Sequence, residues 1–95
     1  MATTVGLIHL EFHIPQAGCL KDKRRVLKSF KDRLAHAFNA SVAEVEAMDL
    51  WRRGVLAVAI VANDKHYLET LVQKIVNMAA LDREMILARH EVQWL

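Results

Sequence analysis

The chain has 95 residues, of which 54% are hydrophobic, and a formal net charge of +2 at neutral pH. A chain of this length forms one domain, because two separate cores would each be too small to be stable. We therefore expect a single domain over residues 1–95, with a core that needs no metal. Cys19 is the only cysteine, which excludes an internal disulfide and fits a reducing compartment.

The sequence also indicates where the protein is found. Its N-terminal residues lack the basic start and long apolar stretch of a signal peptide. The longest apolar run, residues 55–62, is much shorter than the roughly 20 residues of a membrane-spanning helix. These features predict a cytoplasmic protein that does not enter the membrane.

The first predicted elements are a strand and a helix. Residues 5–14 alternate between apolar and polar side chains, a period typical of a strand with one buried face. The polar side chains of this strand are His9, Glu11 and His13. Pro15 and Gly18 then interrupt the chain, and we expect a helix from about residue 20 to residue 39.

This helix is predicted to be amphipathic, with a basic exposed side. At about 100° per residue, one face gathers the apolar side chains Leu20, Leu27, Phe30, Leu34, Ala37 and Phe38. The opposite arc carries Lys21, Arg24, Arg25 and Lys28, with Lys31 at its edge. We call these five residues the basic stripe. Lys21 and Lys23 stand in the first turn, where the helix dipole disfavours each cation by about 0.3–1 kcal/mol.

Three more strands and a second helix are expected. Residues 40–45 form a short strand, and residues 55–62 form a longer one that is apolar on both faces. Asn63 and Asp64 provide an N-terminal cap for the helix. The apolar side of this helix is formed by Tyr67, Leu68, Leu71, Val72, Ile75, Met78 and Ala79. Residues 85–95 are predicted as a fourth strand, with an amphipathic helix in their first half as the alternative.

This order of elements predicts an α+β protein with the ferredoxin-like sandwich fold. Two split βαβ units, in the order βαββαβ, give one four-stranded antiparallel sheet with both helices on one face. The first and third strands are then central neighbours. A central position suits a strand that is apolar on both faces.

The third strand predicts an apolar surface on the sheet face that the helices leave open. Leu56, Val58 and Ile60 are bulky and are expected to face the helices. The residues that then face away are Val55, Ala57, Ala59 and Val61. Such a surface favours self-association or a partner. The alternative is a modest exposed aliphatic strip, which monomers tolerate.

Three stretches of the sequence resemble a known family. Residues 19–27 read CLKDKRRVL, residues 38–45 read FNASVAEV and residues 49–53 read DLWRR. Together with the Ala-Asn-Asp opening of the second helix, they resemble the YlxP-like family of small bacterial domains. Cys19 stands where this family is expected to have serine, and Ala40 where a larger β-branched residue is expected.

The resemblance implies a ferredoxin-like domain without an assigned enzymatic activity and without established catalytic residues. The genes of the family often lie near genes for translation and ribosome maturation. This neighbourhood implies an RNA or ribosome context.

The basic stripe is the first candidate site. Phosphate binding needs several cations on one rigid surface, and the free amide groups at a helix N-terminus also favour anions. The alternative is a solvated helix face on which Asp22 and Asp32 partly neutralise the cations.

The connection over residues 46–54 holds the second candidate site. Trp51 lies beside Arg52 and Arg53, and an indole flanked by guanidinium groups can stack on a base or anchor a protein partner. The alternative is that Trp51 and Leu50 pack over the edge of the sheet while the arginines stay in solvent.

The other reactive side chains do not form a recognisable site. His9 and His13 lie about 13 Å apart along a strand, so they cannot share a metal ion without ligands from other strands, and the sequence does not place His90. Cys19 is interpreted as a small residue at a capping position rather than a reactive thiol. The sequence has no zinc-ligand spacing, phosphate loop or nucleophile elbow. We expect no enzymatic activity, no cofactor and no metal.

These observations predict a non-enzymatic accessory protein that binds RNA or a ribosomal subunit. The predicted contact residues are Lys21, Arg24, Arg25, Lys28, Lys31, Trp51, Arg52 and Arg53. The alternative function is a homodimeric interaction domain. Its predicted self-association residues are Val55, Ala57, Ala59 and Val61.

Overall fold

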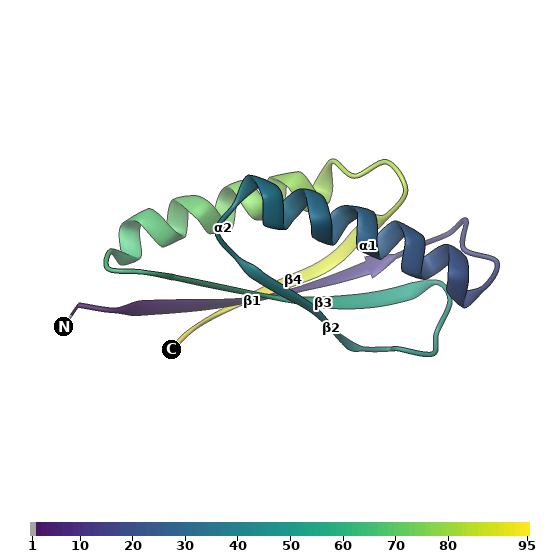
Figure 1. Ribbon diagram of the computed structural model, residues 1–95, viewed down its shortest axis with the longest axis horizontal. Helices are drawn as coiled ribbons and strands as arrows, with labels where there is room; N and C mark the ends of the chain where they lie inside the picture. The colour runs from purple at the N-terminus through teal and green to yellow at the C-terminus, as the bar shows by residue number, and fades with distance from the viewer. Residues whose placement is uncertain (1) are drawn as a thin grey trace.

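The computed structural model describes residues 2–95. The elements are β1 (Thr4–His13), α1 (Leu20–Ala37), β2 (Ser41–Glu46), β3 (Arg53–Ala62), α2 (Lys65–Ala80) and β4 (Ile86–Trp94). Both helices lie on the same face of the sheet, and the other face is open (Figure 1). The predicted ferredoxin-like βαββαβ fold is confirmed, and the tail is a strand rather than a helix.

The sheet has the strand order β2-β3-β1-β4, and all neighbouring strands run antiparallel. As predicted, β1 and β3 are the central pair; their register sets Leu10 opposite Leu56 and Glu11 opposite Val55. β2 and β4 therefore form the two edges. Because side chains alternate along a strand, this register decides which residues reach the helices.

The core lies between the helices and the central strands. From β1 and β3 it receives Ile8, Leu10, Phe12, Leu56, Val58 and Ile60, and from the helices Val26, Leu27, Phe30, Leu34, Leu68, Ile75 and Ala79. The rings of Phe12 and Phe30 meet edge to face with their centroids 5.3 Å apart, a favoured aromatic geometry. The prediction that Leu56, Val58 and Ile60 face the helices is confirmed.

Two helical residues differ from the prediction. Ala37 is exposed rather than part of the buried face of α1, whereas Phe38, the next residue, packs against the core. Tyr67 is exposed rather than part of the buried face of α2. Leu68, the next residue, occupies the core position at this end of the helix.

The two helices start differently. Asp64 caps α2 by accepting a hydrogen bond from the backbone N–H of His66, as predicted for a capping residue. Cys19 occupies the capping position of α1, but its side chain makes no capping hydrogen bond. Instead, Asp22 Oδ2 accepts a hydrogen bond from the N–H of Gly18 at 3.0 Å. Within residues 2–95, neither helix combines the length and apolar character needed to cross a membrane.

Candidate nucleic-acid interface

Most of the basic stripe lies on the side of α1 that faces the edge strand β2. Arg24, Lys28 and Lys31 line a groove between α1 and β2, together with Leu27, Asp32 and Glu44. Lys21 and Arg24 are exposed, and Lys31 is half-buried. Lys28 Nζ donates a hydrogen bond to Asp32 Oδ2 at 2.7 Å, which raises the pKa of Lys28 above its usual 10.5. Lys28 is therefore charged at neutral pH.

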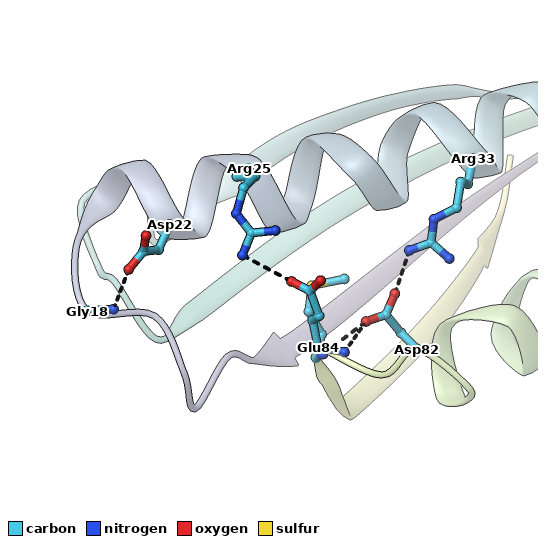
Figure 2. Close-up of polar contacts among 7 residues, drawn as sticks. Gly18, Asp22, Arg25, Arg33, Asp82 and Glu84 are labelled. Atoms are coloured by element: carbon cyan, nitrogen blue, oxygen red, sulfur yellow. Dashed lines mark hydrogen bonds and ion pairs between the residues drawn. The ribbon is translucent and has the colours of Figure 1, made fainter.

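Arg25 lies on the other side of α1, toward the connection between α2 and β4. Its guanidinium group is 3.3 Å from Glu84 Oε2. About two turns further along the same side of α1, Arg33 contacts Asp82 Oδ2 at 2.7 Å (Figure 2). Asp82 Oδ1 also accepts hydrogen bonds from the N–H groups of Glu84 and Met85. Arg25 thus belongs to a set of contacts that fasten α1 to the start of β4, away from the groove.

Lys23 is buried, although its burial was not predicted from the sequence. Its side chain is 1% exposed, and Nζ lies 2.9 Å from Glu44 Oε2 in an ion pair. The same amino group donates a hydrogen bond to the carbonyl of Ala47. On the helical wheel Lys23 falls on the arc of Leu27 and Phe30, and this position is the signal in the sequence that predicts its burial.

The contacts of Lys23 attach the β2–β3 connection, residues 47–52, to the first turns of α1. Ala47 has a φ of 58°, in the left-handed region that residues with a Cβ atom disfavour. The hydrogen bond from Lys23 stabilises this conformation by fixing the Ala47 carbonyl. Near the other end of the connection, Arg52 Nε donates a hydrogen bond to the carbonyl of Ala17 at 3.2 Å.

The structure departs from the packed alternative at Trp51 and Leu50, whereas Arg52 is exposed and the side chain of Arg53 is 42% exposed, as that alternative expects. Trp51 is 51% exposed and Leu50 is also about half exposed, so neither is packed away over the edge of the sheet. Both arginines also make contacts within the protein. Arg52 donates a hydrogen bond to the carbonyl of Ala17, and Arg53 forms an ion pair with Glu11 at 3.2 Å. These contacts form because a backbone carbonyl lies within reach of Arg52 and a carboxylate lies within reach of Arg53.

Trp51, Arg52 and Arg53 do not share the groove of α1. They line a shallow depression with His13, Asp49 and Leu50 on the open side of the sheet. Arg53 also lies 3.9 Å from Glu46, and its hydrogen bond to Glu11 lowers the pKa of Glu11 below its usual 4.5. The structure therefore divides the predicted contact residues among three surfaces: the groove, the side of α1 that carries Arg25, and this depression.

The open sheet face is apolar in one half and charged in the other. Val55, Ala57, Ala59 and Val61 all face away from the helices, as predicted, but Val55 is buried among charged neighbours, Ala57 is half-buried, and Ala59 and Val61 are exposed. The neighbours of Val55 on this face are His9, Glu11, Glu46, Arg53, Arg89 and Glu91. The apolar surface is thus smaller than the sequence suggests.

The histidines are spread over both faces of the sheet. His9 and His13 lie on the open face, whereas the pairing of β4 sets His90 opposite the buried Leu10 and hence on the helix side. Within residues 2–95, the structure holds no group of three or more His, Cys, Asp or Glu side chains that could bind a metal ion.

Comparison with known families matches residues 5–92 to the family described as "Protein of unknown function (DUF503)". The chain belongs to this family. It is also 34% identical over 71 residues to "Uncharacterized protein YlxP" of Bacillus subtilis (strain 168), a match that covers 75% of this chain and 77% of that protein. The resemblance to the YlxP-like family is therefore confirmed.

Two solved structures resemble this member of the DUF503 family in fold. The "De novo designed protein Foldit4" has a TM-score of 0.57 and 21% identity, covering 98% of this chain and 96% of that chain. A C-terminal segment of the alpha subunit of aIF2 from Pyrococcus abyssi has a TM-score of 0.50 and 18% identity, covering 96% of this chain and 49% of that chain. At these identities the likeness shows the shared fold alone.

Proposed function

We propose that this protein is a cytoplasmic, non-enzymatic accessory protein that binds RNA, on its own or in a ribosomal subunit, along the groove between α1 and β2. The observation that supports the proposal is the set of cations on this side of α1. Within residues 2–95, no carboxylate lies within 4.0 Å of the charged groups of Lys21, Arg24 or Lys31. Their charges are therefore available to a partner.

The length of this cationic row fits a short stretch of nucleic-acid backbone. Residues 21–31 span about 15 Å along the helix, at 1.5 Å per residue. A nucleic-acid strand in helical form carries one phosphate per about 3.4 Å of axis. The row therefore faces about four phosphates with four cations: Lys21, Arg24, Lys28 and Lys31.

Salt dependence tests whether phosphates are the ligand. Binding of a fluorescently labelled single-stranded RNA is followed by anisotropy over a series of salt concentrations. Four neutralised phosphates predict that log K falls with log salt at a slope of about −3. Absence of binding, or binding that does not change with salt, contradicts the proposal.

A pair of charge-reversal variants tests whether the groove is the site. Arg24→Glu with Lys31→Glu should weaken RNA binding by roughly tenfold or more and reduce the salt slope by about 1.4, which is half of its wild-type value. The matched control is Lys74→Glu with Arg83→Glu, which changes the net charge equally at exposed positions outside the groove. Co-sedimentation of both variants with ribosomal subunits extends the comparison to the assembled particle.

A second candidate function is self-association through the open sheet face. The exposed Ala59 and Val61 support it, since Val61 is 57% exposed on a strand in the centre of the sheet. Ala59→Glu should then shift a dimer to a monomer in light scattering. A wild-type protein that remains a monomer at high concentration contradicts this candidate.

A further inference from the structure

β4 is an edge strand whose outer side has no partner strand. It is nine residues long, contains no proline, and pairs only through β1 in the strand order β2-β3-β1-β4. The side chains from Ala88 to Gln93 are all exposed. An unpaired edge presents a row of backbone N–H and C=O groups that can pair with another strand.

We propose that β4 pairs antiparallel with β4 of a second copy of this chain, around a two-fold axis at His90. In an antiparallel pair, an axis on one residue sets the residues before and after it opposite each other in both directions. Arg89 of each copy then lies opposite Glu91 of the other. Opposite charges on directly opposed residues stabilise a strand pair.

The charges on the sheet already favour this register. Arg89 and Glu91 both lie on the open face, where their side chains contact each other at 2.6 Å. β1 sets Glu11 beside Arg89 and His9 beside Glu91. Across the proposed interface the row reads Glu11, Arg89 and then Glu91 of the second copy, so negative and positive side chains alternate from one copy into the next.

Other registers and the other edge of the sheet lack this complementarity. An axis at Glu91 sets two glutamates opposite each other, and an axis at Arg89 sets two arginines opposite each other; both arrangements are destabilising. The edge strand β2 has two acidic residues, Glu44 and Glu46, and no cation of its own. The pairing of β4 with β1 is irregular between the partners of Glu11 and Phe12. With the axis at His90, the opposed pairs formed by residues 89–91 lie outside this irregular segment.

The proposed dimer has one continuous eight-stranded sheet. A two-fold axis perpendicular to the sheet keeps both pairs of helices on the same face. α1 contacts β2 at the far edge of each copy, so the two α1–β2 grooves remain open. The proposed dimer therefore does not depend on whether RNA binds in the grooves. The dimer also leaves the open sheet face of both copies uncovered.

Mixing two single charge reversals tests the register. Arg89→Glu alone opposes two pairs of acidic groups, and Glu91→Arg alone opposes two pairs of basic groups. In a mixed dimer of the two variants, every opposed pair is again of opposite charge. Sedimentation equilibrium should show the wild type as a dimer at about 1 mM, each variant alone at the single-chain mass of 10.8 kDa, and the equal mixture as a dimer.

Controls separate the proposed edge from other surfaces. Lys74→Glu, an exposed reversal on α2, should leave the dimer intact, and so should Ala59→Glu on the open sheet face. A wild type that stays at the single-chain mass overturns the proposal. A dimer that survives either single reversal at residues 89 and 91, or one that is lost in Ala59→Glu, also overturns it. A mixture of the two reversals that remains monomeric contradicts the register.

Discussion

Lys23 brings a charged group into the core side of α1, where it lies between Glu44 and the carbonyl of Ala47. A buried ammonium group is unfavourable unless it is paired and hydrogen-bonded. Here the partners come from the end of β2 and the connection that follows it. The ion pair therefore offsets the cost of burying Lys23. It also holds Glu44, which lines the groove together with Arg24, in place.

Replacing Lys23 by methionine should lower the free energy of unfolding by about 3 kcal/mol, because Glu44 and the Ala47 carbonyl lose their partner. Urea unfolding measures the change. The matched control is Lys28→Met, since Lys28 makes its ion pair with Asp32 in solvent. Equal and small losses in the two variants would show that the Lys23 pair does not stabilise the fold.

Glu11 predicts a particular pH dependence of stability. Its pKa is lowered in the folded protein, first by the hydrogen bond from Arg53 and then by the nearby charges of Arg53 and Arg89. A lowered folded-state pKa stabilises the protein above the unfolded-state pKa, and this contribution is lost as the pH falls through the folded-state pKa.

The wild type should therefore be more stable than Glu11→Gln at neutral pH, and the difference should shrink as the pH falls below the ordinary glutamate pKa of 4.5. Urea unfolding of both proteins over a pH series measures this difference. A difference that stays constant through the acidic range contradicts the role of the Glu11 carboxylate.

Single residues also show the limit of reading a helix from its periodicity. The wheel of α1 correctly separates Phe30 and Leu34 from Lys21 and Arg24. It cannot reveal that Arg25 meets Glu84, because that contact depends on how the start of β4 returns to α1. The charge pattern along one helix therefore predicts a stripe but not its division between two sides.

At the scale of elements, the connection between α2 and β4 acts as a clamp on α1. Asp82 is nearly buried, with a side chain 4% exposed, and contacts Arg33. Its other oxygen accepts two backbone hydrogen bonds, from Glu84 and Met85. One carboxylate thus shapes the turn into β4 and joins it to a helix that is distant in sequence (Figure 2).

Asp82→Ala should destabilise the fold by about 2 kcal/mol, because the N–H groups of Glu84 and Met85 lose their acceptor and Arg33 loses its partner. For a domain of this size, that loss lowers Tm by roughly 10 °C. Thermal unfolding followed by circular dichroism measures the shift. Asp32→Ala, which removes the exposed partner of Lys28, is the control and should leave Tm nearly unchanged; a similar Tm for both variants would contradict the clamp.

The elements themselves were largely predictable, and their ends less so. Alternation along β1 and the apolar run of β3 identify both central strands from sequence. β3 nevertheless starts at Arg53 rather than at Val55, because Arg53 and Gly54 pair with His13 and Phe12 of β1. Gly54 is also close to α1, since a Cβ atom there would lie 3.1 Å from Leu27 Cδ1. Such contacts are not visible in local propensity.

At the scale of the whole molecule, the fold separates three surfaces. The α1–β2 groove is cationic, the open sheet face is part apolar and part charged, and the edge strand β4 carries the ion pair of Arg89 and Glu91. The order of elements predicts the layers of this fold. The distribution of charge over these surfaces could not be predicted in the same way, because it depends on the register of the strands and on the path of each connection.

The measurement that most directly tests the central claim is the RNA affinity of Arg24→Glu with Lys31→Glu relative to that of Lys74→Glu with Arg83→Glu. Both variants carry the same net charge, so the comparison isolates position from total charge. We predict that the groove variant binds labelled single-stranded RNA roughly tenfold or more weakly than the control. Equal affinities of the two variants would contradict the assignment of the groove as the RNA-binding site.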